Sequence, residues 1–254
     1  MAIPQTQLRR RGAPFRAILF AAALMRQCIC RVEKLEYPSD QYLFPLRDGA
    51  GGVKSASKLM SQDWSQARAL GEEYLRASTL GDLTPLAAPI ELVEYSPQWP
   101  QRFQEEAQVI QTALGQHALR VEHVGSTSVP GLMAKPIVDI VLVVADSRDE
   151  AGYAPALEKA GYQLRIREPG WHEHRMFKGG NGEVNLHVFS TGCSEVERML
   201  GFRDWLRGNE EDCELYARTK RSLAQEEWKY TQNYADAKTA VIEQILSKAS
   251  RGAP

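Results

Sequence analysis

The sequence predicts an α+β fold, in which helices pack on a small mixed β-sheet and the C-terminal part is helical. Three observations carry this prediction. Residues 137–144 form an apolar run that only Asp139 interrupts, which is typical of a central strand covered on both faces. Residues 98–114 place apolar side chains three and four residues apart, which indicates an amphipathic helix. Residues 194–249 are expected to be helical in three pieces.

The other helices are expected on similar grounds. Residues 61–78 keep Trp64, Leu70 and Leu75 on one side. A short helix is expected to begin at Ser126, which is either a phosphate contact or a simple N-cap, and residues 148–160 are expected to form a helix that ends at Gly161. The full set of expected helices is 61–78, 98–114, 126–133, 148–160 and the three pieces within 194–249.

The expected strands are short apolar or alternating segments bounded by Gly, Pro or polar residues. The sequence GGNG at residues 179–182 indicates a turn that joins the last two strands as a hairpin. Residues 81–89 are expected to be a linker. The expected strands are 90–94, 120–124, 136–144, 162–167, 172–178 and 183–189.

The N-terminal segment has a different character. Arginine is the only charged residue type before Glu33, and a short apolar run lies among these arginines at residues 18–25. This pattern resembles an organellar presequence or a degraded signal peptide. A start codon placed too far upstream is the other explanation, with Met60 as the internal start. We therefore expect a poorly ordered extension over residues 1–59, a helix and linker over 60–84, and the folded domain over 85–249.

Composition excludes several classes of protein. The net charge of −1 over 254 residues gives no electrostatic case for general nucleic-acid binding. No apolar run approaches the roughly 20 residues that span a bilayer, so no membrane partner is expected. The four cysteines form no C-x-x-C pair or zinc-binding spacing. A reduced, cytoplasmic protein is expected, with an organellar location as the alternative if residues 1–32 are a genuine presequence.

Asp139 is the residue that most needs an explanation. On a strand it shares one face with Val141 and Val143, among apolar neighbours. A buried carboxylate is costly unless it is paired, hydrogen-bonded or bound to a metal. We interpret Asp139 as a metal or substrate ligand, and a structural salt bridge to an arginine is the alternative.

Two blocks around Asp139 resemble a known family. Residues 123–132 read HVGSTSVPGL, and residues 135–139 read KPIVD. These blocks resemble the hallmark of the GrpB family, whose members are related to polymerase-β-like nucleotidyltransferases. The resemblance implies a polymerase-β-like nucleotidyltransferase fold over about residues 85–249. Shorter similar segments lie at residues 91–100, 174–177, 185–188, 202–207 and 234–238.

The resemblance also implies a site. In nucleotidyltransferases a Gly-Ser turn holds the nucleotide phosphates and strand carboxylates hold a divalent metal. Gly125 and Ser126 would then hold phosphate, while Asp139 and His187 would act in catalysis and hold Mg²⁺ or Mn²⁺. Lys238 is a candidate because it falls within the apolar stripe of the last helix, where its ammonium group either reaches solvent or points into the site. The further candidate phosphate or substrate ligands are His123, Lys135, Arg175, Arg203 and Lys238.

The chain departs from the pattern of active transferases. These enzymes usually carry a second carboxylate two residues after the first, where this chain has Val141. A third carboxylate usually lies on a later strand, where Asn185 and His187 stand. One Asp with a His and an Asn is a poor cage for Mg²⁺, which prefers several oxygen ligands. Either the metal is a different one, or the site binds phosphate without transferring it.

Three functions are consistent with these residues. The first is binding of a nucleotide or other phosphorylated small molecule, with metal-dependent nucleotidyl transfer as its reaction. The second is a non-catalytic binding or regulatory module of the same fold. The third is a metal-dependent hydrolase that uses His123, His187 and Asp139; the His172-x-His174 spacing could also bind Zn²⁺. Some family members are fused to a dephospho-CoA kinase domain, which hints at coenzyme A metabolism, although this chain has no phosphate-binding P-loop sequence.

Overall fold

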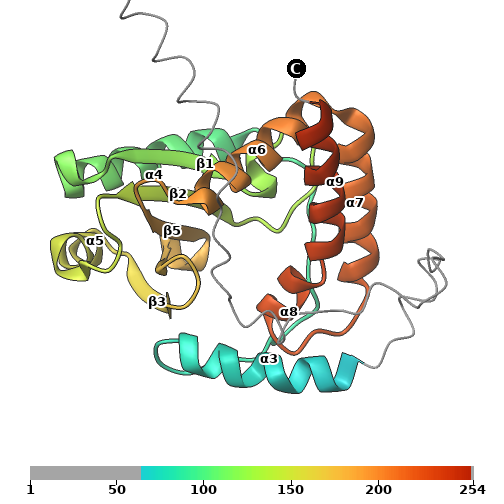
Figure 1. Cartoon of the computed structure of the whole chain (residues 1–254), viewed down its shortest axis with the longest axis horizontal. Helices are drawn as coiled ribbons and strands as arrows, with labels where there is room; N and C mark the ends of the chain where they lie inside the picture. The colour runs from blue at the N-terminus through green and yellow to red at the C-terminus, as the bar shows by residue number, and fades with distance from the viewer. Residues whose placement is uncertain (1–63, 253–254) are drawn as a thin grey trace, which may run out of the picture. The chain divides into compact units, whose positions relative to one another are not determined.

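The computed structural model describes residues 64–252 of the chain (Figure 1). The predicted extension over residues 1–59 lies outside the described residues, as do residues 60–63 of the predicted helix and linker. The presequence and start-codon interpretations therefore stay predictions.

The central element is a five-stranded mixed sheet with the order β1-β2-β5-β4-β3. Strand β2 pairs with β5 in parallel, and the other neighbours are antiparallel. The predicted small mixed sheet is thus confirmed. The strands are β1 (Arg120–Val124), β2 (Val138–Val144), β3 (Gln163–Glu168), β4 (His174–Gly179) and β5 (Val184–Ser190).

Helices cover both faces of this sheet. The α-helices are α3 (Trp64–Ser78), α4 (Gln98–Leu114), α5 (Ala154–Lys159), α6 (Ser194–Gly208), α7 (Glu210–Ala224), α8 (Thr231–Asp236) and α9 (Thr239–Gly252). Single 3₁₀ turns lie at Gly115–His117, Ser126–Ser128, Glu150–Gly152 and Gly180–Gly182.

Strand β2 is buried on both faces, as predicted. Ile140 and Leu142 belong to a core that includes residues of α4 and α5, while Val141 and Val143 pack with residues of α6 on the opposite face. Fully burying an aliphatic side chain contributes about 2 kcal/mol to stability. Both faces of β2 are therefore covered, one by residues of α4 and α5 and the other by residues of α6.

The helical C-terminal part forms a third core. Residues of α6, α7 and α9 pack around Val129 and Leu132, which lie in the loop after β1. Helices α7 and α9 run side by side in Figure 1, with α8 at their end. This packing brings α7 and the α8–α9 junction to the edge of the sheet where β1 ends and β2 begins.

Several predicted elements are wrong in detail. Residues 90–94 form no strand, because only Val93 bridges to Ala134, in a loop rather than a strand. The short helix at 126–133 is one 3₁₀ turn, since Val129 is extended before a proline. Residues 148–160 form a 3₁₀ turn and a six-residue helix, because the backbone of Tyr153 is not helical.

Two further corrections concern the predicted site elements. Residues 194–249 contain four helices rather than three. Lys238 lies in the turn between α8 and α9, so it does not belong to a helical stripe. Along residues 64–252, none of the helices combines the length and the apolar character that crossing a membrane requires.

Candidate functional site

Asp139 lies at the start of β2, an interior strand of the sheet. In the parallel pair β2–β5 its partner is Asn185, and in the antiparallel pair β1–β2 its partner is Val124. The Asn185 Nδ2 atom donates a hydrogen bond of 2.7 Å to Asp139 Oδ1. The Asp139 side chain is 29% exposed, so the carboxylate is neither fully buried nor free in solvent.

Opposing effects act on the pKa of the Asp139 carboxyl. Burial raises it. At the acid pH where Asp139 titrates, a protonated His187 ring lowers it through a hydrogen bond and its charge, as do the hydrogen bond of Asn185 and the charge of Lys238. The lowering effects win, so the pKa lies below its ordinary value. Asp139 is therefore an anion at neutral pH.

Gly125 is required beside this carboxylate. Its φ of +67° is a conformation that L-residues rarely adopt. A Cβ atom placed there would lie 2.4 Å from Asp139 Oδ2. Gly125, predicted as a phosphate ligand, is thus needed for the close approach of the backbone to Asp139, and its contact with phosphate stays a prediction.

We expect Gly125→Ala to lower the free energy of unfolding by about 3 kcal/mol, because strain at positive φ adds to a clash with the carboxylate. Gly131→Ala is the matched control. Gly131 also has a positive φ of +77°, but a Cβ atom there meets nothing within 4 Å. Urea unfolding of both variants measures the difference. Equal losses of unfolding free energy would show that a Cβ atom at position 125 does not clash with Asp139.

Three lysines interact with Asp139, and a fourth, Lys220, interacts with one of them, Lys238. We call the four the lysine cluster: Lys135, Lys178, Lys220 and Lys238. Lys178 is paired with Asn185 across β4 and β5, so it shares the face of Asp139. Lys135 lies in the loop that leads into β2, and Lys220 on α7. The cluster therefore draws on a strand, a loop, a helix and the α8–α9 turn.

Each lysine of the cluster has a lowered pKa. Burial is the largest cause for all four. For Lys135 the charges of Lys238 and Lys178 add to burial and outweigh the attraction of Asp139, which brings its pKa to about 8. For Lys220 burial and the charge of Lys238 bring the pKa to about 7. The lysines thus repel one another in a poorly solvated place, and an anion would relieve that repulsion.

Two tyrosines line the cluster. The Nζ atoms of Lys238 and Lys135 lie 4.7 and 5.6 Å from the centre of the Tyr234 ring. Lys220 Nζ lies 5.0 Å from the centre of the Tyr216 ring and donates to the Met133 carbonyl. Burial raises the pKa of Tyr216 to about 12, although a hydrogen bond with Ser126 opposes this rise. Ser126, a predicted phosphate ligand, is therefore part of the wall of the cluster.

Two buried polar atoms at this place have no hydrogen-bond partner. They are Asn185 Oδ1 and the Tyr234 hydroxyl. A buried polar atom left unpaired costs about 1–3 kcal/mol, so such atoms are rare unless a ligand or water completes them. The Asn185 amide is oriented by its bond to Asp139, which leaves its oxygen free to accept a hydrogen bond from a ligand.

A row of titratable groups leads from Asp139 into the sheet. His187 Nε2 lies 3.8 Å from Asp139 Oδ1, and His187 Nδ1 lies 3.0 Å from His174 Nε2. His174 Nδ1 in turn lies 2.6 Å from Glu168 Oε2. Successive members come from β2, β5, β4 and β3, so the row crosses the sheet. The structure thus places His187 next to Asp139, as predicted.

The donor set does not fit a divalent metal. Asp139 supplies one carboxylate, and its Oδ1 atom already accepts the Asn185 amide. Among the residues that the structure describes, no group of three or more His, Cys, Asp or Glu side chains could hold a metal ion. The charges of Lys135, Lys178 and Lys238 also oppose a bound cation. The predicted metal-binding role of Asp139 and His187 is therefore not supported, and positive charge at the site comes from lysine.

His123 does not join the lysine cluster. It pairs with Ile140 across β1 and β2, which places its ring on the opposite face of the sheet from Asp139. There the ring stacks on Phe103 at 4.9 Å, and Nε2 lies 3.0 Å from Thr127 Oγ1. Burial lowers its pKa to about 4. His123 is thus a satisfied core histidine, which also weakens a hydrolase built on His123, His187 and Asp139.

Arg203 is also occupied elsewhere. Its guanidinium donates to the Glu122 carboxylate and the His123 carbonyl at 2.9 Å each, and to Asp204 at 2.7 Å. With Arg207 it lines a surface cavity of about 290 Å³ next to His123. Arg203 therefore ties α6 to β1, and the structure does not bring it to Asp139.

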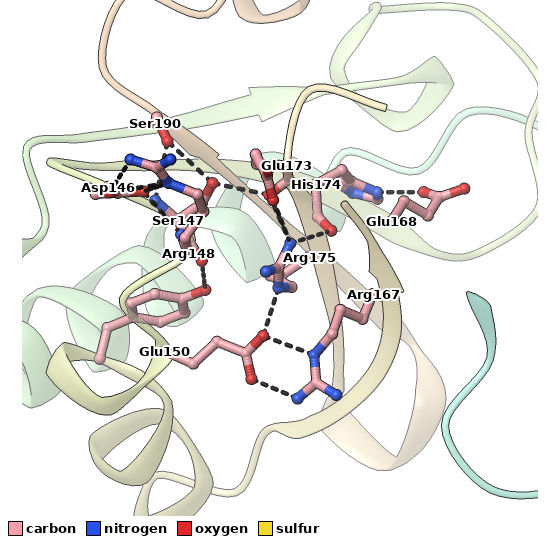
Figure 2. Close-up of polar contacts among 11 residues, drawn as sticks. Asp146, Ser147, Arg148, Glu150, Arg167, Glu168, Glu173, His174, Arg175 and Ser190 are labelled. Carbon is pink, nitrogen blue, oxygen red and sulfur yellow. Dashed lines mark hydrogen bonds and ion pairs between the residues drawn. The ribbon is translucent and has the colours of Figure 1, made fainter. Parts of the chain in front are cut away.

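Arg175 lies on the face of the sheet opposite His187. It pairs with Val188, the neighbour of His187 along β5, and it is 5% exposed. Its Nε atom donates to Glu150 at 2.5 Å, and Glu150 also binds Arg167 (Figure 2). The structure does not bring Arg175, a predicted phosphate ligand, to Asp139, because its guanidinium pairs with the half-buried Glu150.

The proposed zinc spacing of His172 and His174 also fails. His172 lies before β4, exposed and with a φ of +52°, so the two side chains do not share a strand face. His174 is buried and bound to Glu168 (Figure 2).

The main residues missed from the sequence are Lys178, Lys220, Tyr216 and Glu168. One signal was available for Lys178, because it shares a face with His174 and Met176 on a strand of the predicted hairpin. Lys220 and Tyr216 lie on a helix about 80 residues after Asp139, and only tertiary packing brings them to the site. Glu168 gave no signal, since it ends a strand among other charged residues.

Comparison with known proteins gives a consistent result. The GrpB protein family matches residues 89–248. A protein of Halalkalibacterium halodurans named UPF0157 protein BH1888 is 57% identical over 189 residues, which cover 74% of this chain and 97% of that protein. A protein named dephospho-CoA kinase from Mycolicibacterium paratuberculosis is 33% identical over 165 residues, 54% of this chain and 40% of that protein.

Solved structures agree on the fold. The crystal structure of the conserved protein GrpB from Enterococcus faecalis covers 63% of this chain and 96% of its own, with 33% identity and a TM-score of 0.56. The predicted α+β fold of this family is thereby confirmed. Structures of the Cid1 poly(U) polymerase also align, over 63% of this chain and 50% of theirs, but with 8% identity and a TM-score of 0.35. A likeness at that level carries no argument about activity or ligands.

Proposed function

Because the chain belongs to the GrpB family, we propose that its lysine cluster binds a phosphorylated small molecule, such as a nucleotide. The ammonium groups contact phosphate oxygens directly, without a divalent metal between them. One observation carries this proposal: Lys135, Lys178 and Lys238 all interact with the carboxylate of Asp139. Asp236 also acts on Lys238, so three lysines face two carboxylates and positive charge is in excess. Charge-assisted hydrogen bonds to phosphate are about twice as strong as neutral ones.

The unpaired atoms support the same proposal. Asn185 Oδ1 accepts a hydrogen bond, and the Tyr234 hydroxyl can donate one to an oxygen anion. A phosphorylated ligand that carries a hydroxyl group would satisfy both. Nucleotides and sugar phosphates have this combination, and dephospho-coenzyme A, suggested by the name of one relative, has it as well.

The non-catalytic module is the second candidate. Val141, where transferases usually carry a carboxylate, is fully buried and packs in the core with α6. Position 141 is therefore part of the core rather than of the site. Binding does not need a carboxylate there, whereas a metal-dependent transfer reaction would.

The binding proposal predicts a pH dependence. Lys220 and Lys135, with pKa values of about 7 and 8, bind an anion only when protonated. Binding then takes up protons near pH 8, and affinity is lost as pH rises through these values. We expect the affinity for inorganic triphosphate to fall at least tenfold between pH 7 and pH 9.

Titration calorimetry in EDTA measures this effect. Repeating the titration at pH 8 in buffers of different ionisation enthalpy reports the protons taken up. Lys159→Met is the control, because Lys159 is exposed at the end of α5, away from the cluster. Binding that requires Mg²⁺, or affinity that stays constant from pH 7 to pH 9, would count against the lysine cluster.

A further inference from the structure

The row of titratable groups beside Asp139 fixes where the protons lie. Burial raises the pKa of Glu168, but its hydrogen bonds with His174 and Tyr74 outweigh burial, so the pKa lies below its ordinary value. Glu168 is therefore ionised at neutral pH and only accepts hydrogen bonds. His174 Nδ1, at 2.6 Å from Glu168 Oε2, must carry a proton (Figure 2).

The second nitrogen of His174 is then unprotonated. Burial lowers the pKa of His174 to about 4, despite the favourable hydrogen bond of Glu168, so the ring is neutral at pH 7. It packs between Trp171 at 5.2 Å and Phe189 at 4.9 Å, which keep water away from it. A neutral ring with a proton on Nδ1 has a lone pair on Nε2.

His187 receives its orientation from this lone pair. His174 Nε2 accepts at 3.0 Å from His187 Nδ1, so His187 Nδ1 carries a proton. The only ring nitrogen of His187 that can gain or lose a proton is then Nε2. That atom faces Asp139 Oδ1 at 3.8 Å, on the same face of β5 as the unpaired Asn185 Oδ1.

We infer that His187 Nε2 is the proton acceptor of this site, held in that state by Glu168 and His174 as positioning residues. Its substrate is a hydroxyl group of a ligand or acceptor molecule, which donates its single proton to Nε2. Asn185 Oδ1, on the same face of β5, remains an acceptor for a second donor of the ligand. This inference rests on the proposed function for the identity of the ligand but not for the proton arrangement.

The hydroxyl O–H bond breaks, an N–H bond forms at Nε2, and Asp139 stabilises the resulting imidazolium. The hydroxyl oxygen uses its electron pair to form a bond to the phosphorus of a phosphate held by the lysine cluster. The bond from phosphorus to its leaving oxygen breaks at the same time, and a phosphate or diphosphate anion leaves with that electron pair.

Nitrogen-15 NMR of the histidine rings in the free, full-length protein tests the proton arrangement. At pH 7.5 we expect both His174 and His187 to carry a proton on Nδ1. This form is the less common one for histidine in solution, so a chance match is improbable. A proton on Nε2 of neutral His187 would overturn the inference, because that atom could not accept another.

A variant tests the coupling along the row. Glu168→Leu removes the acceptor for His174 Nδ1, so the His174 proton should move to Nε2 and donate to His187 Nδ1. The His187 proton should then move to Nε2. Tyr74→Phe is the control, since it removes one hydrogen bond to Glu168 but leaves the Glu168–His174 pair, and both rings should keep their protons on Nδ1.

A purely structural Glu168–His174 pair would change His174 alone, and an unchanged His187 in Glu168→Leu would contradict the inference. If that variant does not fold, the wild-type spectrum decides the question by itself. Both measurements use protein without ligand, so a failure of triphosphate binding leaves them intact. The proposed function and the proton acceptor can therefore fail separately.

Discussion

Replacing both Lys135 and Lys238 with methionine should weaken the binding of inorganic triphosphate by at least about a hundredfold. Each lysine offers one charge-assisted hydrogen bond to phosphate, and each such bond contributes about 1.5–3 kcal/mol. Methionine has an unbranched apolar side chain of similar length, and it removes only the ammonium group that in both lysines lies over the Tyr234 ring. Calorimetry on the double variant and on Lys159→Met measures the loss.

The same double variant should not lose stability. Burial lowers the pKa of both lysines, and the charge of Lys238 further lowers the pKa of Lys135 and Lys220, so the charged forms destabilise the unliganded protein. We expect the melting temperature to hold or to rise by a few degrees. A large fall in melting temperature would mean that the two ammonium groups support the fold, and unchanged triphosphate affinity would remove them from the site.

Acid should destabilise the protein strongly between pH 6.5 and pH 4. Burial lowers the pKa of both His123 and His174 to about 4, whereas an unfolded histidine titrates near 6.5. As pH falls through 6.5, these two histidines bind protons in the unfolded chain but stay neutral in the folded protein. Stability is therefore complete above pH 6.5 and is lost as pH approaches 4. Each histidine contributes roughly 3 kcal/mol to this loss.

Urea unfolding at several pH values between 7.5 and 5 measures this slope. Carboxylates also titrate at the lower end of this range, so the histidine share is found by difference. His174→Gln should be less stable at pH 7.5 but should lose about half of the pH dependence. A free energy of unfolding that stays constant between pH 7 and pH 5 would show that these rings take up protons in the folded state.

Much of the sheet could be predicted from the pattern of apolar residues. The run around Asp139 indicated a strand covered on both faces, and β1 was predicted with its observed bounds. The shared face of Asn185 and His187 was also predicted from alternation, because side chains on a strand point to opposite sides in turn. These features depend on short-range order.

The side chains that face each other across strands were harder to predict. His123 lies one residue from Val124, which faces Asp139, and a shift of one residue in register decides the face. That register depends on the loop between β1 and β2, whose conformation the sequence does not reveal. Arg175 was correctly placed on the opposite face of its strand, but its partner Glu150 lies in a segment predicted to be helical.

The lysine cluster was only half predictable. Lys135 and Lys238 were candidates because of their sequence context. The only signal for Lys178 was its place on a strand of the predicted hairpin, and Lys220 gave no signal. Lys220 is 2% exposed, and on sequence alone it appears among the polar residues of a charged helix. Its role depends on how α7 packs against the loop after β1, which is a long-range contact.

The two proposals assign different parts of the site to different tasks. The lysine cluster holds phosphate and supplies the positive charge that a divalent metal supplies in a carboxylate cage. The row from Glu168 to His187 is not needed for phosphate binding. It offers the unprotonated Nε2 atom of His187, which carries no positive charge for a phosphate. A module that only binds would retain the lysines, whereas a transfer enzyme would also need the proton acceptor at His187.

A crystal structure of the full chain grown with inorganic triphosphate and EDTA tests the central claim most directly. We predict triphosphate oxygens within hydrogen-bond distance of Nζ of Lys135, Lys178 and Lys238, beside the turn at Gly125. A triphosphate held instead by Arg203 and Arg207, in the cavity next to His123, would contradict the assignment of the lysine cluster as the phosphate site.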